Sequence, residues 1–213
     1  IAGGNTIFKG AYLGTEDTSL KPLVTPVGAE FSYDARDNSI NVWMNISTSD
    51  ATKNLNVIGA SANMVNVHDD IGTAERKYKD LVMTGLAGLS LDAGKTAYIS
   101  GSVTFGNAEE VLDLGDGTKV TGGLKSVVGG GGDLSAGKLK VSGTSTIEGG
   151  AGTSLTDGIR EIIFDPAVNS VAKFVSQDNT ANLFVVTNNA TLGGATGEIN
   201  VTPPTGANTV VSV

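Results

Sequence analysis

Apolar and polar residues alternate in many short stretches of this chain. In residues 39–47, four aliphatic or sulfur-containing side chains share one parity, and Trp43 falls among the polar residues of the other. A period of two is typical of a β-strand with one buried face. The same kind of pattern predicts further strands at residues 55–58, 97–105, 138–147, 159–164, 171–175, 183–187, 198–201 and 209–213.

Helical spacing is found in one segment only. Apolar residues recur at intervals of three and four over residues 70–83, and Asp69 or Asp70 is suited to cap the first turn. Gly72 is unfavourable inside a helix. We therefore predict an all-β fold, an immunoglobulin-like or jelly-roll-like β-sandwich, with at most one short helix.

Glycine marks the breaks between these stretches and accounts for 30 of the 213 residues. Four consecutive glycines, Gly129 to Gly132, pack no side chain and lose much backbone entropy on ordering. This segment is predicted to be a mobile surface loop or an internal boundary. We expect residues 1–22 to form an N-terminal extension and residues 23–213 to form the sandwich, with its possible boundary near 129–132.

Two internal similarities have two explanations. Residues 91–95 resemble residues 134–138, and residues 33–40 resemble residues 164–171. A β-sandwich can reuse the same turn sequences, and a chain can also repeat a supersecondary unit. The sequence leaves both open.

Composition excludes several classes of function. There is no cysteine, which excludes disulfide scaffolds, thiolate metal sites and cysteine nucleophiles. The formal charge of −8 argues against nucleic-acid binding, and no apolar run is long enough for a membrane-spanning helix. A charged fraction of 17% and 39% hydrophobic residues are typical of a secreted β-protein with a real core.

Candidate catalytic residues are few. His68 is the single histidine, and its neighbours Asp69 and Asp70 point in different directions along an extended chain. No Gly-x-Ser-x-Gly motif is present, so a hydrolytic triad is not indicated. One histidine is too few for a zinc site. We predict no enzymatic activity, no catalytic residue, no cofactor and no bound metal.

Three further features leave alternatives open. Asp113 and Asp116 lie in a stretch that suits a glycine-rich hairpin turn better than a calcium loop. Trp43 suits the core or an interface, and a sugar site is the alternative. Sequons at Asn45, Asn189 and Asn200 permit glycans where the source glycosylates secreted chains.

Residues 23–28, 31–34 and 49–57, followed by residues 91–105 with Gly94 and Tyr98, resemble the cysteine-free chaperone–usher pilins of the colonisation-factor and common-pilus type. The similarity covers about a third of the chain and does not include residues 148–213. It implies an immunoglobulin-like subunit that lacks one strand, which a terminal segment of a neighbouring subunit supplies.

The segment from residue 5 to residue 13 fits such a donor strand. It follows a Gly-Gly pair and has apolar residues on both parities. The candidate polymerisation residues are Ile7, Phe8, Ala11, Tyr12 and Leu13. Residues 209–213 are the rival donor.

The leading hypothesis is therefore a structural subunit of an extracellular filament on the cell surface. Its partners would be copies of itself, forming a homopolymer, and an assembly chaperone. The alternatives are a virion coat or surface-layer subunit and a secreted carbohydrate-binding domain.

Overall fold

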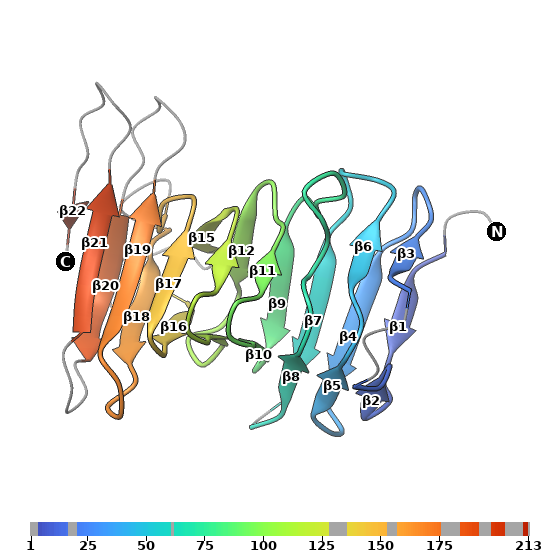
Figure 1. Ribbon diagram of the computed structural model, residues 1–213, viewed down its shortest axis with the longest axis horizontal. Helices are drawn as coiled ribbons and strands as arrows, with labels where there is room; N and C mark the ends of the chain where they lie inside the picture. Colours follow the sequence, from blue (N-terminus) through green and yellow to red (C-terminus); the bar gives the residue numbers. More distant parts are fainter. Residues whose placement is uncertain are drawn as a thin grey trace.

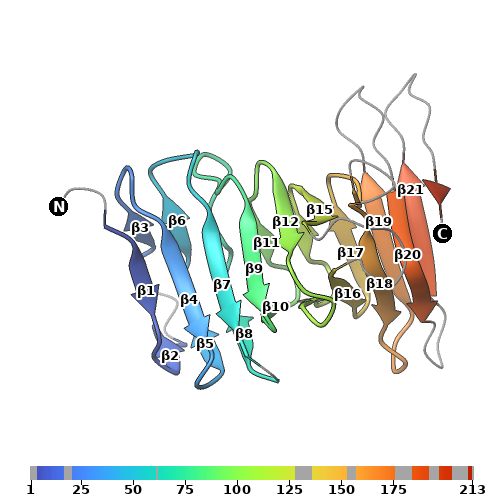
Figure 2. The same ribbon diagram turned by 180° about the vertical axis from the view of Figure 1, so that it is seen from behind.

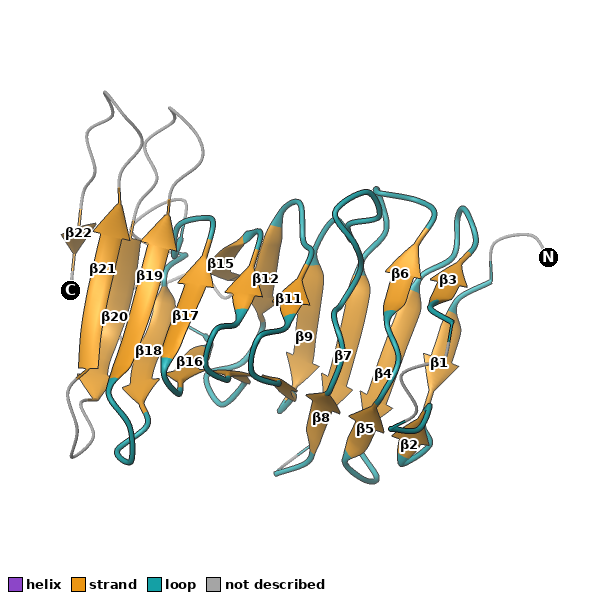
Figure 3. Cartoon of the chain, viewed as in Figure 1, coloured by secondary structure: helices purple, strands orange, loops and turns teal. Residues whose placement is uncertain are grey.

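The computed structural model describes residues 4–16, 21–60, 62–127, 136–152, 157–175, 184–191, 197–202 and 211–212. All regular elements in this part are β-strands, and none is a helix (Figure 3). No helix in these ranges is therefore long and apolar enough to span a membrane. The prediction of an all-β protein is confirmed.

The strands form a β-solenoid of about six turns, so the prediction of an immunoglobulin-like or jelly-roll-like sandwich is wrong. All strand pairs in the described ranges are parallel, whereas the predicted sandwich needs antiparallel pairs. Successive turns stack side by side, with β1 and β21 at opposite ends of an elongated body (Figures 1 and 2). Paired positions such as Phe31 and Leu55, or Val103 and Leu124, lie one turn apart, 24 and 21 residues along the chain.

Three faces are built in this way. Sheet A contains, in order, β1 (Thr6–Phe8), β4 (Phe31–Ala35), β7 (Leu55–Gly59), β9 (Leu81–Gly85), β12 (Ser102–Phe105) and β15 (Gly123–Ser126). Sheet B contains β2 (Tyr12–Leu13), β5 (Ile40–Val42), β8 (Met64–Val67), β10 (Gly88–Leu91), β13 (Val111–Leu114), β16 (Lys138–Val141), β18 (Ile159–Phe164), β20 (Phe184–Thr191) and β22 (Val211–Ser212).

Sheet C contains β11 (Thr96–Ala97), β14 (Lys119–Val120), β17 (Thr144–Ile147), β19 (Ser170–Val175) and β21 (Gly197–Thr202). The pair β3 (Leu23–Thr25) and β6 (Ile46–Thr48) lies on the same face, because single bridges through Ile71 connect Ile46 to Ala97. From β18 to β21 the chain alternates between sheets B and C. Among the described residues, sheet A continues past β15 as a single bridge from Leu124 to Ala151.

The core is a set of aliphatic and aromatic ladders along the axis. Every second residue of a strand points inward and stacks on its equivalent in the next turn. On sheet B this ladder consists of Val42, Val67, Leu91, Leu114, Val141 and Phe164, each at most 2% exposed. Burying each such side chain contributes about 1.5–3 kcal/mol, so the turns are stable only as a stack.

Corners explain why several predicted strands are each two strands. Residues 39–47 form β5 and β6 with a corner between them, and residues 97–105 and 138–147 are divided in the same way. The alternation continues through the corner because inward residues occur on both sides of it. The segment at 70–83 is not helical: Ile71 and Tyr78 form single bridges and Leu81 begins β9, all three facing the core.

The domain boundaries stay predictions, but the position of the N-terminal residues is described. β1 and β2 belong to the first turn and pair with β4 and β5 of the same chain. Gly129 to Gly132 lie outside the described residues. A supersecondary unit does repeat, with one turn as the unit. The similar segments 33–40 and 164–171 do not occupy equivalent positions, since Tyr33 is in sheet A and Phe164 is in sheet B.

Candidate functional site

The outer surface of sheet B near the N-terminal end carries a row of polar and aromatic side chains. We call it the sheet B strip, and it consists of Tyr12, Asn41, Trp43, Asn66, His68, Ser90 and Asp92. Tyr12, Asn41, Asn66 and Ser90 are paired positions on β2, β5, β8 and β10. These four positions form the first row. Trp43, His68 and Asp92 form the second row: they come two residues later, directly after β5, β8 and β10, and their backbone amides continue the hydrogen-bonded register, so they point to the same side.

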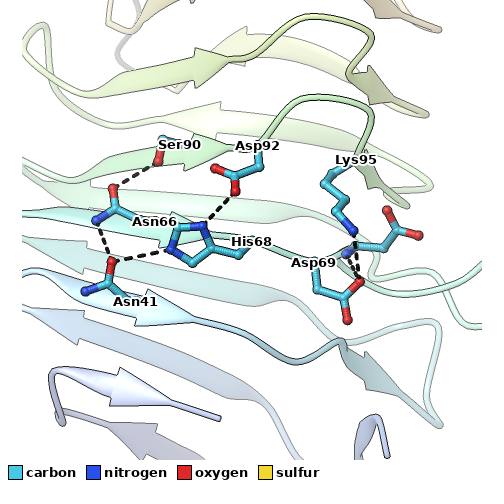
Figure 4. Close-up of polar contacts among 8 residues, drawn as sticks. Asn41, Asn66, His68, Asp69, Ser90, Asp92 and Lys95 are labelled. Atoms are coloured by element: carbon cyan, nitrogen blue, oxygen red, sulfur yellow. Dashed lines mark hydrogen bonds and ion pairs between the residues drawn. The ribbon is translucent and has the colours of Figure 1, made fainter. Parts of the chain in front are cut away.

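Hydrogen bonds connect the first row across the strands (Figure 4). The amide of Asn66 donates from Nδ2 to Oδ1 of Asn41 over 3.2 Å. The hydroxyl of Ser90 donates to Oδ1 of Asn66 over 3.0 Å. The three side chains therefore hold one another in fixed orientations before any ligand arrives.

His68 joins the two rows. Its Nδ1 lies 2.7 Å from Oδ2 of Asp92, and its Nε2 lies 3.4 Å from Oδ1 of Asn41 (Figure 4). Its ring stacks on the indole of Trp43, with 3.7 Å between ring centroids and 17° between planes. The imidazole is thus held at both nitrogens and on one face, and its side chain is only 17% exposed.

Trp43 has a second face. Gly14, which follows β2, takes the register position beside Trp43 because the amide of Trp43 donates to the carbonyl of Leu13. Glycine has no side chain to cover the indole from this position. Tyr12 lies diagonally across from it and is 70% exposed. Strand spacing and a two-residue step place the two aromatic residues about 8 Å apart at the backbone.

Catalysis by a Ser-His-Asp device is not supported by this geometry. His68 and Asp92 are bonded, but the hydroxyl of Ser90 is directed to Asn66. In the ranges that the structure describes, no group of three or more histidine, cysteine or acidic residues is arranged to hold a metal ion. The strip has the features of a binding surface.

Asp113 and Asp116 do not come together as calcium ligands. Asp113 lies on β13 and binds Lys140 at 2.8 Å, while Oδ1 of Asp116 accepts from the backbone amide of Thr144. Asp116 and Asp165 line a shallow pocket of about 350 Å³. Both carboxylates already accept hydrogen bonds from their own surroundings.

The five candidate polymerisation residues lie in the first turn. Phe8 and Leu13 pack against the core, whereas Ile7 and Tyr12 are 55% and 70% exposed. The carbonyl of Ala11 accepts from the amide of Asn41. Their transfer to a neighbouring subunit stays a prediction, and in this structure they are paired within their own chain.

The sequon at Asn45 is not available to a glycan. Asn45 is 9% exposed and its Nδ2, the atom that would carry the sugar, donates to the carbonyl of Gly72 over 2.7 Å. The side chains of Asn189 and Asn200 lie outside the described part of the structure.

Sequence reasoning missed the grouping of Trp43 with His68. A usable signal was present, because Asn41-Val42-Trp43 recurs 25 residues later as Asn66-Val67-His68.

Sequence reasoning also missed Glu110, a carboxyl that is 0% exposed at the corner before β13. Its Oε2 accepts from the amide of Gly106, and its Oε1 has no hydrogen-bond partner among the described residues.

The chain matches no family model, no curated protein and no solved structure. The resemblance to pilins therefore stays a prediction. The immunoglobulin-like fold that it implied is absent.

Proposed function

We propose that this chain is an extracellular, non-enzymatic β-solenoid that binds carbohydrate through the sheet B strip. The observation that supports this best is the stack of Trp43 on His68 beside the amide row. A pyranose ring has an apolar face of C–H groups and a rim of hydroxyls. An aromatic platform suits the face, and amide and carboxylate groups suit the rim because they donate and accept at fixed positions.

Preorganisation strengthens the case. Asn41, Asn66 and Ser90 are bonded to one another, and His68 is fixed by Asp92. A ligand that replaces water here does not have to order these side chains, so less free energy is lost on binding. The strip lies on a continuous parallel sheet whose inner face is buried, which limits backbone movement beneath the ligand.

Trp43 is the single tryptophan, so its fluorescence reports directly on this surface. We would titrate the chain with β-1,4-linked oligosaccharides of glucose, N-acetylglucosamine and mannose, and screen a wider panel on a glycan array. We expect at least one saccharide to change Trp43 emission, and Trp43→Ala to lose array binding at least tenfold.

Asn66→Ala should weaken binding at least threefold. Asn56→Ala is the matched control, because Asn56 is the same residue type on the outer side of sheet A. Absence of any Trp43-dependent saccharide binding, with the fold intact by circular dichroism, would overturn the proposal. Equal losses from Asn56→Ala and Asn66→Ala would do the same.

Self-association into a structural assembly is a second candidate. β1, β2 and β3 are each paired on one side only within the described residues, and Ile7 and Val27 on the first turn are 55% and 69% exposed. Open strand edges with apolar side chains favour pairing with another chain. Analytical sedimentation should show polymers of the parent chain and a monomer for the double variant Ile7→Lys/Val27→Lys. A monomer at all concentrations tested would refute this candidate, without bearing on the sugar proposal.

A further inference from the structure

The outer surface of sheet B continues beyond the strip in the same register. Asp113 follows Ser90 in the first row, and Lys140 follows Asp113. Gly115, Ser142 and Asp165 continue the second row after Asp92. The two rows therefore run along the solenoid axis, crossing the strands, and do not run along any one strand.

Dimensions of the surface fit a single sugar chain. Neighbouring strands are ~4.8 Å apart, and two residues along a strand span ~6.6 Å. The first distance is about the length of one unit in an extended β-1,4-linked glycan, and the second is about the width of one ring. From Tyr12 to Lys140 there are five strand spacings, or ~24 Å, which five or six sugar units would cover.

The charges on this surface are of one sign or already paired. Asp92 is 48% exposed and lies in the second row. Lys140, the ammonium at the far end of the first row, is bonded to Asp113 over 2.8 Å. Asp92 would therefore repel a carboxylate or sulfate on a ligand. At the described positions of these two rows, no lysine or arginine without a carboxylate partner is present to offset this repulsion.

We infer that the ligand of the sheet B strip is an uncharged, extended glycan that lies along the solenoid axis, with its end at Tyr12 and Trp43. This inference rests on the proposed function and gives it a ligand class and a direction. Short saccharides would contact only the aromatic and amide end. Longer ones would reach Asp113 and Lys140.

Length dependence tests the direction. We would measure calorimetric affinities for cello-, chito- and manno-oligosaccharides of two to six units. Affinity should rise at least tenfold from two to six units. The double variant Asp113→Ala/Lys140→Ala should weaken the hexasaccharide at least threefold and change the disaccharide less than twofold. Lys119→Ala/Glu148→Ala, which removes an ion pair on sheet C, is the matched control and should change neither.

Charge selection is tested with oligo-β-1,4-glucuronates, which differ from cello-oligosaccharides only at C6. They should bind at least tenfold more weakly in low salt, and the difference should shrink as salt screens Asp92. Asp92→Asn should restore glucuronate binding at least threefold, since an asparagine oxygen can still accept from His68.

Each result has a separate meaning. Equal or tighter glucuronate binding would overturn the charge selection. Affinity that stops rising at two or three units, or equal effects of the double variant on short and long ligands, would overturn the axial direction. Both results leave Trp43-dependent binding, and thus the proposed function, standing. Loss of binding to every saccharide in the series and on the array would remove the proposed function itself.

Discussion

Glu110 should make the stability of this protein fall as pH rises from acidic to neutral. Its carboxyl is fully shielded from solvent, and its Oε2 accepts a hydrogen bond from the amide of Gly106 at 2.6 Å. Burial raises the pKa of Glu110 to about 7 from an ordinary value of 4.5, and the backbone hydrogen bonds only partly oppose this. The charged form is therefore disfavoured in the folded state.

The size of the effect comes from the difference between the pKa of Glu110 in the folded chain and its ordinary value in the unfolded chain. Below pH 4.5 the carboxyl is protonated in both the folded and the unfolded chain, and its pKa shift costs nothing. Between about 4.5 and 7 the unfolded chain releases the proton while the folded chain keeps it, so folding becomes less favourable as pH rises. Above about pH 7 the loss is complete and amounts to about 3 kcal/mol.

Glu110→Gln should remove this pH dependence. We would measure the free energy of unfolding by urea titration at pH 4 and pH 8 for both proteins. The variant's stability relative to the parent should rise by about 2–3 kcal/mol from pH 4 to pH 8. The constant cost of burying an amide cancels in this comparison, as do the contributions of other titrating groups.

Glu109→Gln is the control from the neighbouring position. The Glu109 side chain is 60% exposed and is bonded to Lys138, which lowers the pKa of Glu109. Its substitution should therefore give a small change of the opposite sign. If the difference in the free energy of unfolding between Glu110→Gln and the parent is the same at pH 4 as at pH 8, the account of Glu110 as a buried, poorly solvated carboxyl is refuted.

Two other predictions concern the corners and the ion pairs that the buried Asp34 carboxylate makes with exposed cations. Gly85 has a φ of +81° and a side chain there would meet the carbonyl of Gly59, whereas Gly94 at +74° faces open space. Gly94→Ala should lower the free energy of unfolding, measured in urea, by about 1 kcal/mol, and Gly85→Ala should lower it by at least about 2 kcal/mol more. Equal losses from the two substitutions would contradict the close contact at Gly85. The Arg36 guanidinium, with Lys9, holds the pKa of Asp34 well below its ordinary value. Asp34→Asn should lower stability at pH 7 by about 1–3 kcal/mol, and this loss should shrink as pH falls below about 4; an undiminished loss at pH 2 would contradict it.

The alternation in the sequence was enough to predict strands but not their arrangement. A period of two shows that one face is buried, and it is the same for a strand in a sandwich and a strand in a solenoid. Parallel pairing depends on contacts 21 to 29 residues apart, as between Val103 and Leu124 or Tyr12 and Asn41. These contacts follow from the repeat length, and corners of variable length hide that repeat.

The helical spacing at residues 70–83 has a physical explanation. Ile71, Tyr78 and Leu81 all face the core, but they do so from two single bridges and a strand on different faces. A corner between two faces brings inward residues three or seven positions apart. The same spacing marks one side of a helix, so local pattern cannot separate the two cases.

The candidate site was only partly predictable. Trp43 was placed on the polar side of its strand and a sugar site was among its alternatives, but its partner His68 was considered only as a catalytic or zinc-binding candidate. The two residues are 25 positions apart and meet because one turn of the solenoid has that length at this point. Asp92 joins them one turn later. Such a site becomes visible only when the register between turns is known.

The most direct test of the account is to map a bound glycan onto the surface by NMR. Amide and indole signals would be followed while a neutral hexasaccharide, cellohexaose or chitohexaose, is added to the ¹⁵N-labelled chain. The account predicts that shifts concentrate at the Trp43 indole and along β5, β8 and β10, and extend to β13 and β16. Shifts that concentrate on sheet A or sheet C, or none at saturating glycan, would contradict it.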